Sequence, residues 1–448
     1  MNIKNVIHIC LLGCTMLQAD TSGAQPVTKV SAGEYYTLLL KGDGSLWAVG
    51  DNYYGELGDG TYGSAPDYGT NYPEQIVATN VTAIAAGEGD SSMFLKNDGS
   101  LWAMGYNGYG ELGDGTDNTT DSPELILATN VTAIALGENH TLLLKSDGSL
   151  WAMGEDNYGQ LGNGAYTFPY PDRPLQILAS NVTAIAAGMW HSLLLKSDSS
   201  VWAMGFNGDG QLGDGTYNKI NHPELIASNV TAIAAGGSHS LLLKSDGSLW
   251  GMGYNNYGQL GDGTYNTANH PEQIVPSGVT AIAGGGEHSL FLKNDGSLWA
   301  MGWNGYGQLG DGTYNNTNRP EQIAAGDVTA IAAGWDHSLF LKSNGSLWAM
   351  GDNGSGELGD GTYNTTNRPE QILAAFNQIS GQLLGGTNMQ FSFVGIAGAN
   401  YVLERSSNLS SPDWIPQATN PASSFGALVF TNPPDLTTNN FWRIRSVP

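Results

Sequence analysis

Apolar and polar positions recur in blocks of about 50 residues between Val27 and Ile372. Each block holds three apolar runs, of which Val328–Gly334, His337–Lys342 and Ser346–Gly351 are one set. These runs are six or seven residues long and apolar at both parities, which is typical of strands buried on both faces. No window shows a sustained stripe at the 3.6-residue helical period. The pattern therefore predicts an all-β chain with almost no helix.

The residues between the runs predict how the strands connect. Asn344-Gly345, or Asp-Gly in most other blocks, separates the second run from the third and is a strong hairpin signal. A polar loop of roughly 20 residues then leads to Pro369–Ile372, which we expect to be a short edge strand opened by proline. Each block is thus predicted to form four strands, which we call A, B, C and D in chain order.

The blocks are copies of one another. Each carries a tryptophan in strand C, with successive spacings of 55, 49, 51, 48, 49 and 49 residues, and a G-[EQ]-L-G-[DN]-G run follows at a fixed distance. The tryptophans, which we expect to be structural, are Trp47, Trp102, Trp151, Trp202, Trp250, Trp299 and Trp348. Units of this size cannot each own a core, so seven of them must share one by stacking.

Radial stacking of four-stranded units makes a β-propeller, with the Ala- and Gly-rich strand A nearest the axis. A solenoid is the alternative, but it needs polar capping units at its ends, and the terminal units here are as apolar as the others. How the ring closes stays open: the blades are self-contained, or strand 369–373 joins the first repeat.

The motif G-x-N-x-x-G-Q-L-G-D-G, with A-A-G-x-x-H-S-L before it, resembles the regulator of chromosome condensation family of seven-bladed propellers. The resemblance covers about 345 residues and recurs seven times. This chain reads Leu-Trp-Ala-Met-Gly where the family more often places tryptophan next to glycine. The resemblance implies a propeller over residues 27–375 and a role in macromolecular interaction.

Both ends of the chain depart from the repeat. Residues 376–448 hold alternating runs at Gln390–Val394, Tyr401–Arg405, Ala427–Phe430 and Phe441–Arg445, which predict a small antiparallel β-sandwich. Residues 1–24 have the pattern of a secretory signal peptide, so we expect an exported protein that begins at Gln25. Leu11-Leu12-Gly13-Cys14 also resembles a lipobox, and lipoprotein processing at Cys14 is the alternative. No other apolar run approaches the ~18 residues of a membrane span.

Charge and cysteine content narrow the classes of function. The net charge is −25, from 41 acidic and 16 basic residues, which disfavours binding to a phosphate backbone. Both cysteines, Cys10 and Cys14, lie in the predicted signal, so disulfides are not expected in the mature chain. Nucleic acid is therefore not an expected partner, and we expect a monomer.

Three recurring patterns suggest chemistry but have simpler explanations. Gly305–Gly310 matches G-x-G-x-x-G, yet it lies in a repeated loop with no helix expected after it, which favours a tight turn over a dinucleotide site. The Asp-Gly-Thr runs lack the spacing of a calcium loop, which favours turn-forming aspartates. Equivalent histidines recur in five units, too far apart around a ring to share a metal ion. These are His140, His191, His239, His288 and His337, which we expect to be buried and bonded to backbone groups of their own blade.

One surface of the predicted propeller differs from unit to unit. The A–B and C–D loops emerge at one end of the blades, and their first residues vary, whereas the B–C hairpins at the other end all carry a lysine before the turn. Positions that the scaffold leaves unconstrained can serve a partner, and exposed aromatics are frequent binding hot spots. The predicted partner-binding residues are Tyr35, Tyr106, Trp190, Phe206, Tyr254, Trp303, Trp335 and Asp336.

The sequence shows no nucleophile with its base and no paired-carboxylate cleft, so we expect no enzyme and no cofactor. The first hypothesis is an exported propeller that binds a protein through the A–B/C–D face. Secreted bacterial members of the resembled family include inhibitors of β-lactamases, which makes inhibition of an exported enzyme one version of this hypothesis. The alternatives are a regulator similar to guanine-nucleotide exchange factors and a carbohydrate-binding propeller.

Overall fold

The computed structural model of the chain describes residues 9–10, 25–63, 69–373, 380–384, 388–394, 400–406, 415–421, 427–432 and 441–447. Regular secondary structure in these ranges consists of strands, as the sequence predicts. Among the same residues, no helix has the length and hydropathy needed to cross a membrane. Cys14, most of the predicted signal and the predicted boundary at 375/376 lie outside these ranges.

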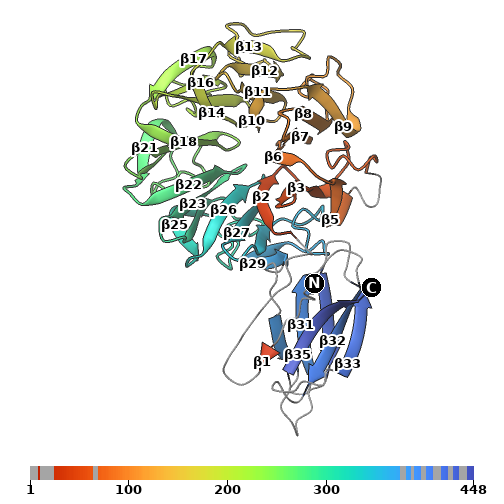
Figure 1. Ribbon diagram of the computed structural model, residues 1–448. Coiled ribbons are helices and arrows are strands. Elements are labelled where there is room, and N and C mark those ends of the chain that lie inside the picture. The colour runs from red at the N-terminus through yellow and green to blue at the C-terminus, as the bar shows by residue number, and fades with distance from the viewer. Residues whose placement is uncertain are drawn as a thin grey trace. The chain divides into compact units, whose positions relative to one another are not determined.

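Seven four-stranded antiparallel sheets stand around a common centre in the described part of the propeller (Figure 1). Each sheet is one blade, numbered 1 to 7, and takes its strands in the order A, B, C, D from the centre outward. The A strands are β2 (Val27–Ala32), β6 (Val81–Ala86), β10 (Val131–Leu136), β14 (Val182–Ala187), β18 (Val230–Ala235), β22 (Val279–Gly284) and β26 (Val328–Ala333). The B strands are β3 (Tyr36–Lys41), β7 (Ser91–Lys96), β11 (His140–Lys145), β15 (His191–Lys196), β19 (His239–Lys244), β23 (His288–Lys293) and β27 (His337–Lys342).

The C strands are β4 (Leu46–Asp51), β8 (Leu101–Gly105), β12 (Leu150–Gly154), β16 (Val201–Gly205), β20 (Leu249–Gly253), β24 (Leu298–Gly302) and β28 (Leu347–Gly351). The D strands are β5 (Gly69–Val77), β9 (Thr120–Leu127), β13 (Leu175–Leu178), β17 (Ile220–Ala227), β21 (Ala268–Val275), β25 (Thr317–Ala324) and β29 (Thr366–Leu373). Small residues in the A strands suit the crowded centre, where these strands from all seven blades line one axial cavity.

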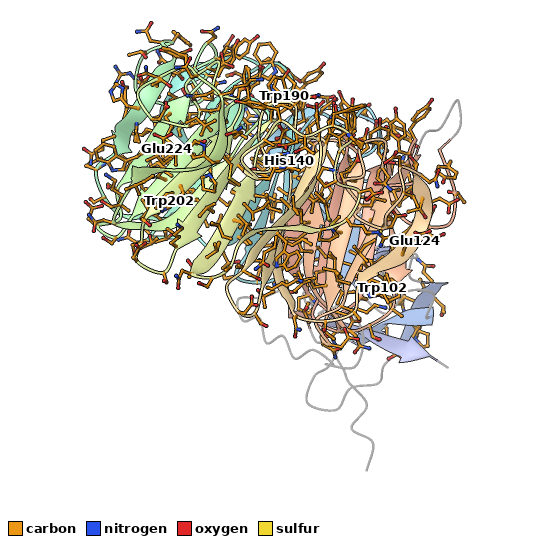
Figure 2. All side chains as sticks on the ribbon, turned by 90° about the horizontal axis from the view of Figure 1, so that it is seen from above. Trp102, Glu124, His140, Trp190, Trp202 and Glu224 are labelled. Atoms are coloured by element: carbon orange, nitrogen blue, oxygen red, sulfur yellow. The ribbon has the colours of Figure 1, made fainter. Side chains whose placement is uncertain are left out.

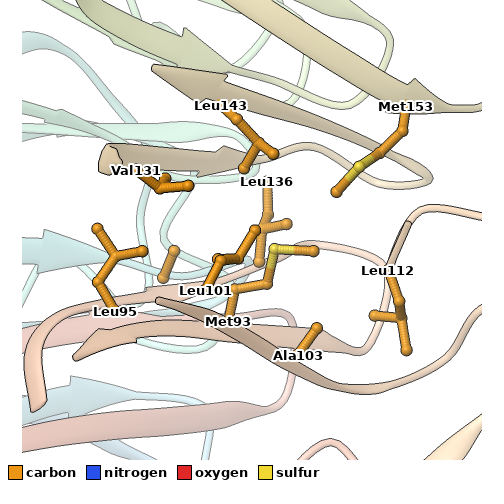
Figure 3. Packing of buried hydrophobic residues seen from close by; sticks show 10 residues of the cluster. Met93, Leu95, Leu101, Ala103, Leu112, Val131, Leu136, Leu143 and Met153 are labelled. Carbon is orange, nitrogen blue, oxygen red and sulfur yellow. The ribbon is translucent and has the colours of Figure 1, made fainter. Parts of the chain in front are cut away.

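The core lies between blades rather than within them. Between blades 2 and 3, Met93 and Leu101 of one blade pack against Leu143 and Met153 of the next (Figure 3). The B strands are buried along both faces, because a neighbouring blade covers each face of the sheet. This arrangement explains why the B runs are apolar at both parities, and burial of such side chains stabilises by roughly 2 kcal/mol each.

The D strands differ from the prediction at their starts. Six of the seven are eight or nine residues long and begin before their proline, as β9 does at Thr120 rather than Pro123. A register shift between Ala103 and Gly105 lets the strand continue past the proline, whose missing N–H would otherwise interrupt the ladder. The expected start at proline is therefore wrong by about three residues.

The ring closes without strand exchange, because blade 1 (β2-β3-β4-β5) and blade 7 (β26-β27-β28-β29) each contain four consecutive strands. Contacts across the closure repeat those between other blades. The amide of Trp335 donates to the carbonyl of Gly33 over 3.2 Å, and His337 Nε2 lies 3.0 Å from Thr37 Oγ1.

The C-terminal part of the chain is a separate compact unit, divided from the propeller after Ile372. One of its sheets holds β30 (Ser380–Leu384), β31 (Asn388–Val394) and β34 (Ala427–Asn432). The other holds β1 (Ile9–Cys10), β35 (Phe441–Val447), β32 (Asn400–Ser406) and β33 (Ile415–Pro421). The four predicted strands are present, and β30 and β33, whose sequences lack a clear apolar alternation, were not predicted.

Candidate functional site

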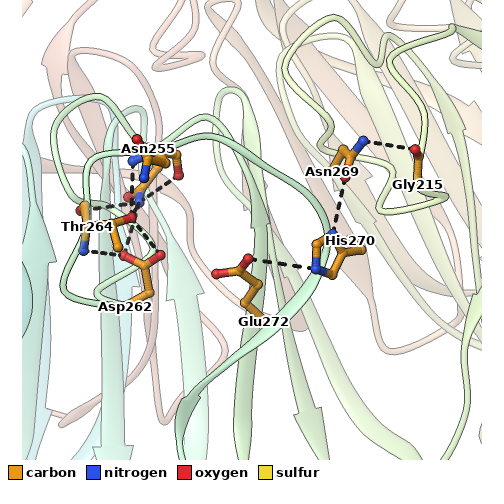
Figure 4. Close-up of polar contacts among 8 residues, drawn as sticks. Gly215, Asn255, Asp262, Thr264, Asn269, His270 and Glu272 are labelled. Carbon is orange, nitrogen blue, oxygen red and sulfur yellow. Dashed lines mark hydrogen bonds and ion pairs between the residues drawn. The ribbon is translucent and has the colours of Figure 1, made fainter.

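The repeated glycine-rich motif builds the C–D loops and fixes their shape. In blade 5, Asn255 Oδ1 accepts from the amide of Leu260, while its Nδ2 donates to Asp262 over 3.2 Å (Figure 4). Asp262 in turn accepts from the amide and hydroxyl of Thr264. Asp262 therefore stabilises the turn to which it belongs, as its position before Gly-Thr predicts.

Blade 3 carries the same bond with the two residue types exchanged. Asp156 replaces the asparagine, Asn163 replaces the aspartate, and Asn163 Nδ2 donates to Asp156 Oδ2 over 2.9 Å. The motif therefore conserves a donor–acceptor pair within the chain rather than a charge, which is what a structural turn requires.

The G-x-G-x-x-G match belongs to this loop. Gly307 and Gly310 have φ of +83° and +76°, and the amide of Gly310 donates to the carbonyl of Gly307. A side chain at Gly307 would meet the backbone of Asn367 in the outer strand of the next blade. These glycines serve tight turns and close packing, and a loop rather than a helix follows them.

The recurring histidines join blades to one another. All five are buried, and the Nε2 of each lies 2.8 to 3.0 Å from a hydroxyl on strand B of the next blade, as His288 does with Ser338. Ser289 Oγ donates to the carbonyl of Gln259, so the histidine facing it donates from Nε2 and leaves Nδ1 as a buried acceptor without a partner. The expected partners, backbone groups of the same blade, are wrong because the ring points across the blade interface.

The hairpin end of the propeller is uniform. Each strand-C tryptophan lies under the lysine of its own blade, with Nζ 3.6 to 4.5 Å from the ring centre. Trp47 is 8% exposed and the other six are half-buried. The lysines therefore cover the tryptophans by cation–π contact and are not separate surface charges.

The loops at the opposite end form the surface we call the variable face, which comprises the A–B loops and the C–D loops of the seven blades. Figure 2 shows Trp190 at this end of its blade and Trp202 nearer the other end. All eight predicted partner-binding residues lie here, immediately after an A or C strand, and all are half-buried. Their shared position is as predicted, but none projects freely.

The aromatic residues of the variable face pack on one another across blade boundaries. Trp190 and Phe206 both contact Tyr158, with ring centroids 5.5 and 5.1 Å apart. Trp303 contacts Tyr257 at 4.7 Å, and Tyr106 contacts Tyr54 at 4.9 Å. The structure thus brings five of the predicted aromatics, with Tyr254 beside Tyr257, into three separate clusters around the ring.

The tyrosines that complete these clusters were missed from the sequence. Tyr54, Tyr109, Tyr158 and Tyr257 occupy one repeated position in the N-x-Y-G segment. Their near-constancy among the copies gave no sign of a site, whereas the structure places each against an aromatic residue of the next blade. Tyr109 also contacts Tyr170 in the C–D loop of blade 3, and Tyr170 contacts Phe168, which is 82% exposed.

Carboxyl groups are the second feature of the variable face. Burial, together with the nearby carboxylates of Glu34 and Asp51, raises the pKa of Asp90 to about 7. Burial raises the pKa of Asp336 to about 7 as well, helped by Asp352 and Glu287. Asp336 accepts from Gln308 Nε2 over 2.9 Å, which holds its carboxylate beside the aromatic surface.

The chemistry that this surface supports is recognition. Among the described residues, no group of three or more His, Cys, Asp or Glu side chains has the geometry to hold a metal ion. Aromatic rings bordered by carboxyl groups are suited to contact with a partner molecule.

Comparisons with known proteins agree with this architecture. The family model described as "RCC1-like domain" matches residues 127–392, and models of the regulator of chromosome condensation (RCC1) repeat match residues 98–144, 27–56 and 81–111. None of the curated proteins matches the chain significantly by sequence.

Solved structures show the same fold at low sequence identity. Human WBSCR16 is 24% identical, with a TM-score of 0.68, and the match covers 75% of this chain and 96% of that one. Prp20p of Saccharomyces cerevisiae, described with its binding to Gsp1p and histones, is 21% identical, with a TM-score of 0.66 and coverage of 79% and 90%. Because one family model spans more than half of its length, this chain belongs to the RCC1-like domain family of seven-bladed β-propellers.

Proposed function

We propose that this chain is an exported, non-catalytic propeller that binds a protein partner through the variable face. The observation that carries the proposal is the contrast between the two ends of one repeated blade. The hairpin end repeats a lysine-on-tryptophan contact seven times, whereas the variable face carries three different aromatic clusters. Large, half-buried aromatics at such positions are typical of interface hot spots.

Inhibition of an exported enzyme is the specific form of this function that we favour. The RCC1-like family supports protein interaction, and the predicted signal over residues 1–24 favours a partner outside the cytoplasm. N-terminal sequencing of the protein purified from its host should find Gln25. An intact Met1 on cytoplasmic protein would contradict export, and an acylated Cys14 would replace signal-peptide cleavage by lipoprotein processing.

Carbohydrate binding is a second candidate because of a separate set of exposed rings. Tyr217, Tyr265 and Tyr314 are 50–54% exposed at one repeated position of the C–D loops, and Tyr62, Tyr166 and Tyr363 occupy the same position in three other blades. Exposed rings of this kind suit stacking on sugars, but they lie in the uniform part of the loop and show no blade-to-blade specialisation.

The test is capture of partners by the mature chain, residues 25–448, from secreted proteins of its host, with a glycan array and a small GTPase as separate probes. We expect a protein that is retained by the wild type and lost with W190A/W303A/W335A. The matched control is K244Q/K293Q/K342Q, which changes three residues at the hairpin end. Retention of glycans alone would overturn the protein-binding proposal.

A further inference from the structure

The residues that follow the A strands differ from blade to blade, and one of them, Glu88, lines the axial cavity. The cavity has a volume of about 280 Å³ and is lined by alanine and isoleucine side chains of the A strands, with Glu88 as its only charged lining residue among those described. The position that follows the glycine after each A strand holds Glu34, Glu88, Glu138, Met189, Gly237, Gly286 and Trp335 in blades 1 to 7. Three consecutive blades therefore present carboxyl groups, and the remaining four present none.

A network of backbone hydrogen bonds holds this position in place. The amide of Glu138 donates to Met189, that of Met189 to Gly237, that of Gly286 to Gly334, and that of Trp335 to Gly33. In blades 3 to 7 the backbone at this position is therefore bonded to a neighbouring blade, and the side chains distinguish one blade from another.

The carboxyl group of Glu88 has a buried oxygen without a hydrogen-bond partner. The residue as a whole is half-buried, but its carboxyl group is surrounded by protein, and Oε2 is buried without a hydrogen-bond partner. Glu138 Oε2 on the neighbouring blade is likewise buried and unpartnered, while Trp190 donates a hydrogen bond to the same carboxyl group. Burial, followed by the charges of Glu138 and Glu34, raises the pKa of Glu88 to about 8.

Trp335 lies on the side of the mouth without carboxyl groups. A side chain at Gly286 would meet its indole at 2.7 Å, and one at Gly237 would meet it at 3.3 Å, so both glycines leave room for the ring. Carboxyl groups on one arc and an aromatic face on another form a common arrangement for binding organic cations. A metal ion is a poorer fit, because the described carboxylates do not converge as metal ligands.

The geometry points to the mouth of the axial cavity as a binding site for a lysine or arginine side chain of the partner, with Glu88 and Glu138 receiving the charged end. The aliphatic stem, which trails the charged end toward the partner, packs on the indole of Trp335, since such stems pack on apolar surface while the charge is paired. This inference rests on the proposed function and specifies the chemistry of the partner residue that enters the propeller.

The experiment titrates the mature protein with n-butylammonium and n-butylguanidinium chloride at pH 7 and constant ionic strength. Binding is followed by calorimetry and by NMR of the tryptophan indoles. We expect saturable binding that weakens at least tenfold in E88Q and is unchanged in E224Q, whose substituted residue lies on the outer strand of blade 4. With a pKa of about 8, Glu88 is mainly protonated at pH 7 in the free protein and must ionise to pair with the cation. Binding should therefore also release protons, seen as a dependence of the heat on the buffer.

The outcomes separate this inference from the proposed function. Equal binding to wild type and E88Q, or the absence of saturable binding, would overturn the inference, and partner capture through the aromatic clusters would still stand. Cation binding that requires Glu88 supports the inference by itself, whether or not W190A/W303A/W335A abolishes capture. Thermal unfolding of E88Q should be unimpaired at pH 8, so a folding defect would not explain its loss of binding.

Discussion

At the residue scale, comparison among the repeats identifies Ser199 as a residue with an unfavourable backbone conformation. It occupies the second turn position of the blade 4 hairpin, where six other blades have glycine, and its φ is +64°. Left-handed backbone costs an L-residue about 1 kcal/mol relative to glycine. The Asp-Gly pairs of the other blades dictate the turn type, so this strain can be predicted from the sequence.

We therefore expect S199G to raise the free energy of unfolding by about 0.5–1 kcal/mol, which denaturant titration would measure. G247S, the reverse change at the equivalent turn of blade 5, should lower it by a similar amount. A loss of stability in S199G would show that the serine side chain contributes more than its backbone costs.

His288 and Ser338 provide the residue-scale test of the blade junction. Their bond of 2.8 Å is buried, and the desolvated imidazole has a pKa lowered to about 3, so it stays neutral in the folded state. The H288A/S338A double-mutant cycle should give a coupling energy of about 1 kcal/mol. A coupling near zero would mean that the histidine serves packing alone.

The same histidines set the acid side of the stability profile. A folded pKa of about 3 below an unfolded value of 6.5 gives stability that is present above pH 6.5 and is lost as pH falls toward 3. The free energy of unfolding of H288A should therefore fall less than that of the wild type as the pH is lowered from 6 to 4.

At the element scale, the C–D loops differ at one position, which holds glutamine in some blades and glutamate in others. Gln259 Oε1 accepts from the amide of Tyr257, and glutamine holds this place in four blades. Glu56, Glu111 and Glu357 hold it in the other three, with one carboxyl oxygen on the loop amide and the other buried without a partner. Burial raises their pKa values to about 9, 8 and 8.

These raised values imply stability that is highest when the carboxyls are protonated. For an acid whose folded pKa exceeds its unfolded one, stability falls as pH rises from about 4.5 through 8 to 9. At pH 9, E56Q/E111Q/E357Q should have a larger free energy of unfolding than the wild type, by on the order of 1–3 kcal/mol per site, and should therefore unfold at a higher temperature. The difference should vanish near pH 4.5, and a difference independent of pH would contradict this explanation.

Trp250 tests the strand-C element at the hairpin end. A buried tryptophan would cost roughly 3–5 kcal/mol on truncation, but this ring is half-buried under Lys244, so W250A should cost about 2–3 kcal/mol. K244Q should cost less than 1 kcal/mol, the value of an exposed cation–π contact. Chemical denaturation of both variants checks the order, and a larger loss in K244Q would reverse the assignment.

Strand order, hairpins and the A strands at the axis were all predictable from the sequence because they follow from local pattern and period. The contacts between blades were not: the histidine partners and the tyrosines under Trp190 and Trp303 lie about 30 to 50 residues away and depend on the ring. The site was predictable as a set of positions, because variation among copies is visible in the chain. Its clustering and half-burial required the fold.

At the scale of the whole molecule, one junction recurs at five of the seven blade boundaries, including the one that closes the ring. Blade 7 meets blade 1 through His337 and Thr37, and Thr37 Oγ1 donates to the carbonyl of Glu357 as Ser289 does to Gln259 within the ring. The scaffold is therefore nearly symmetric, and the asymmetry of the molecule is concentrated in the variable face. This distribution is the physical reason for assigning partner binding to that face.

The most direct test of this assignment is calorimetry of the captured partner with three forms of the mature protein. W190A/W303A/W335A should weaken binding by several kcal/mol, since hot-spot truncations cost ~2 kcal/mol or more each without strict additivity. K244Q/K293Q/K342Q should leave the affinity almost unchanged. Thermal unfolding must show both variants folded at the temperature of measurement. Binding lost in the lysine variant and retained in the tryptophan variant would place the interface at the hairpin end and contradict the account.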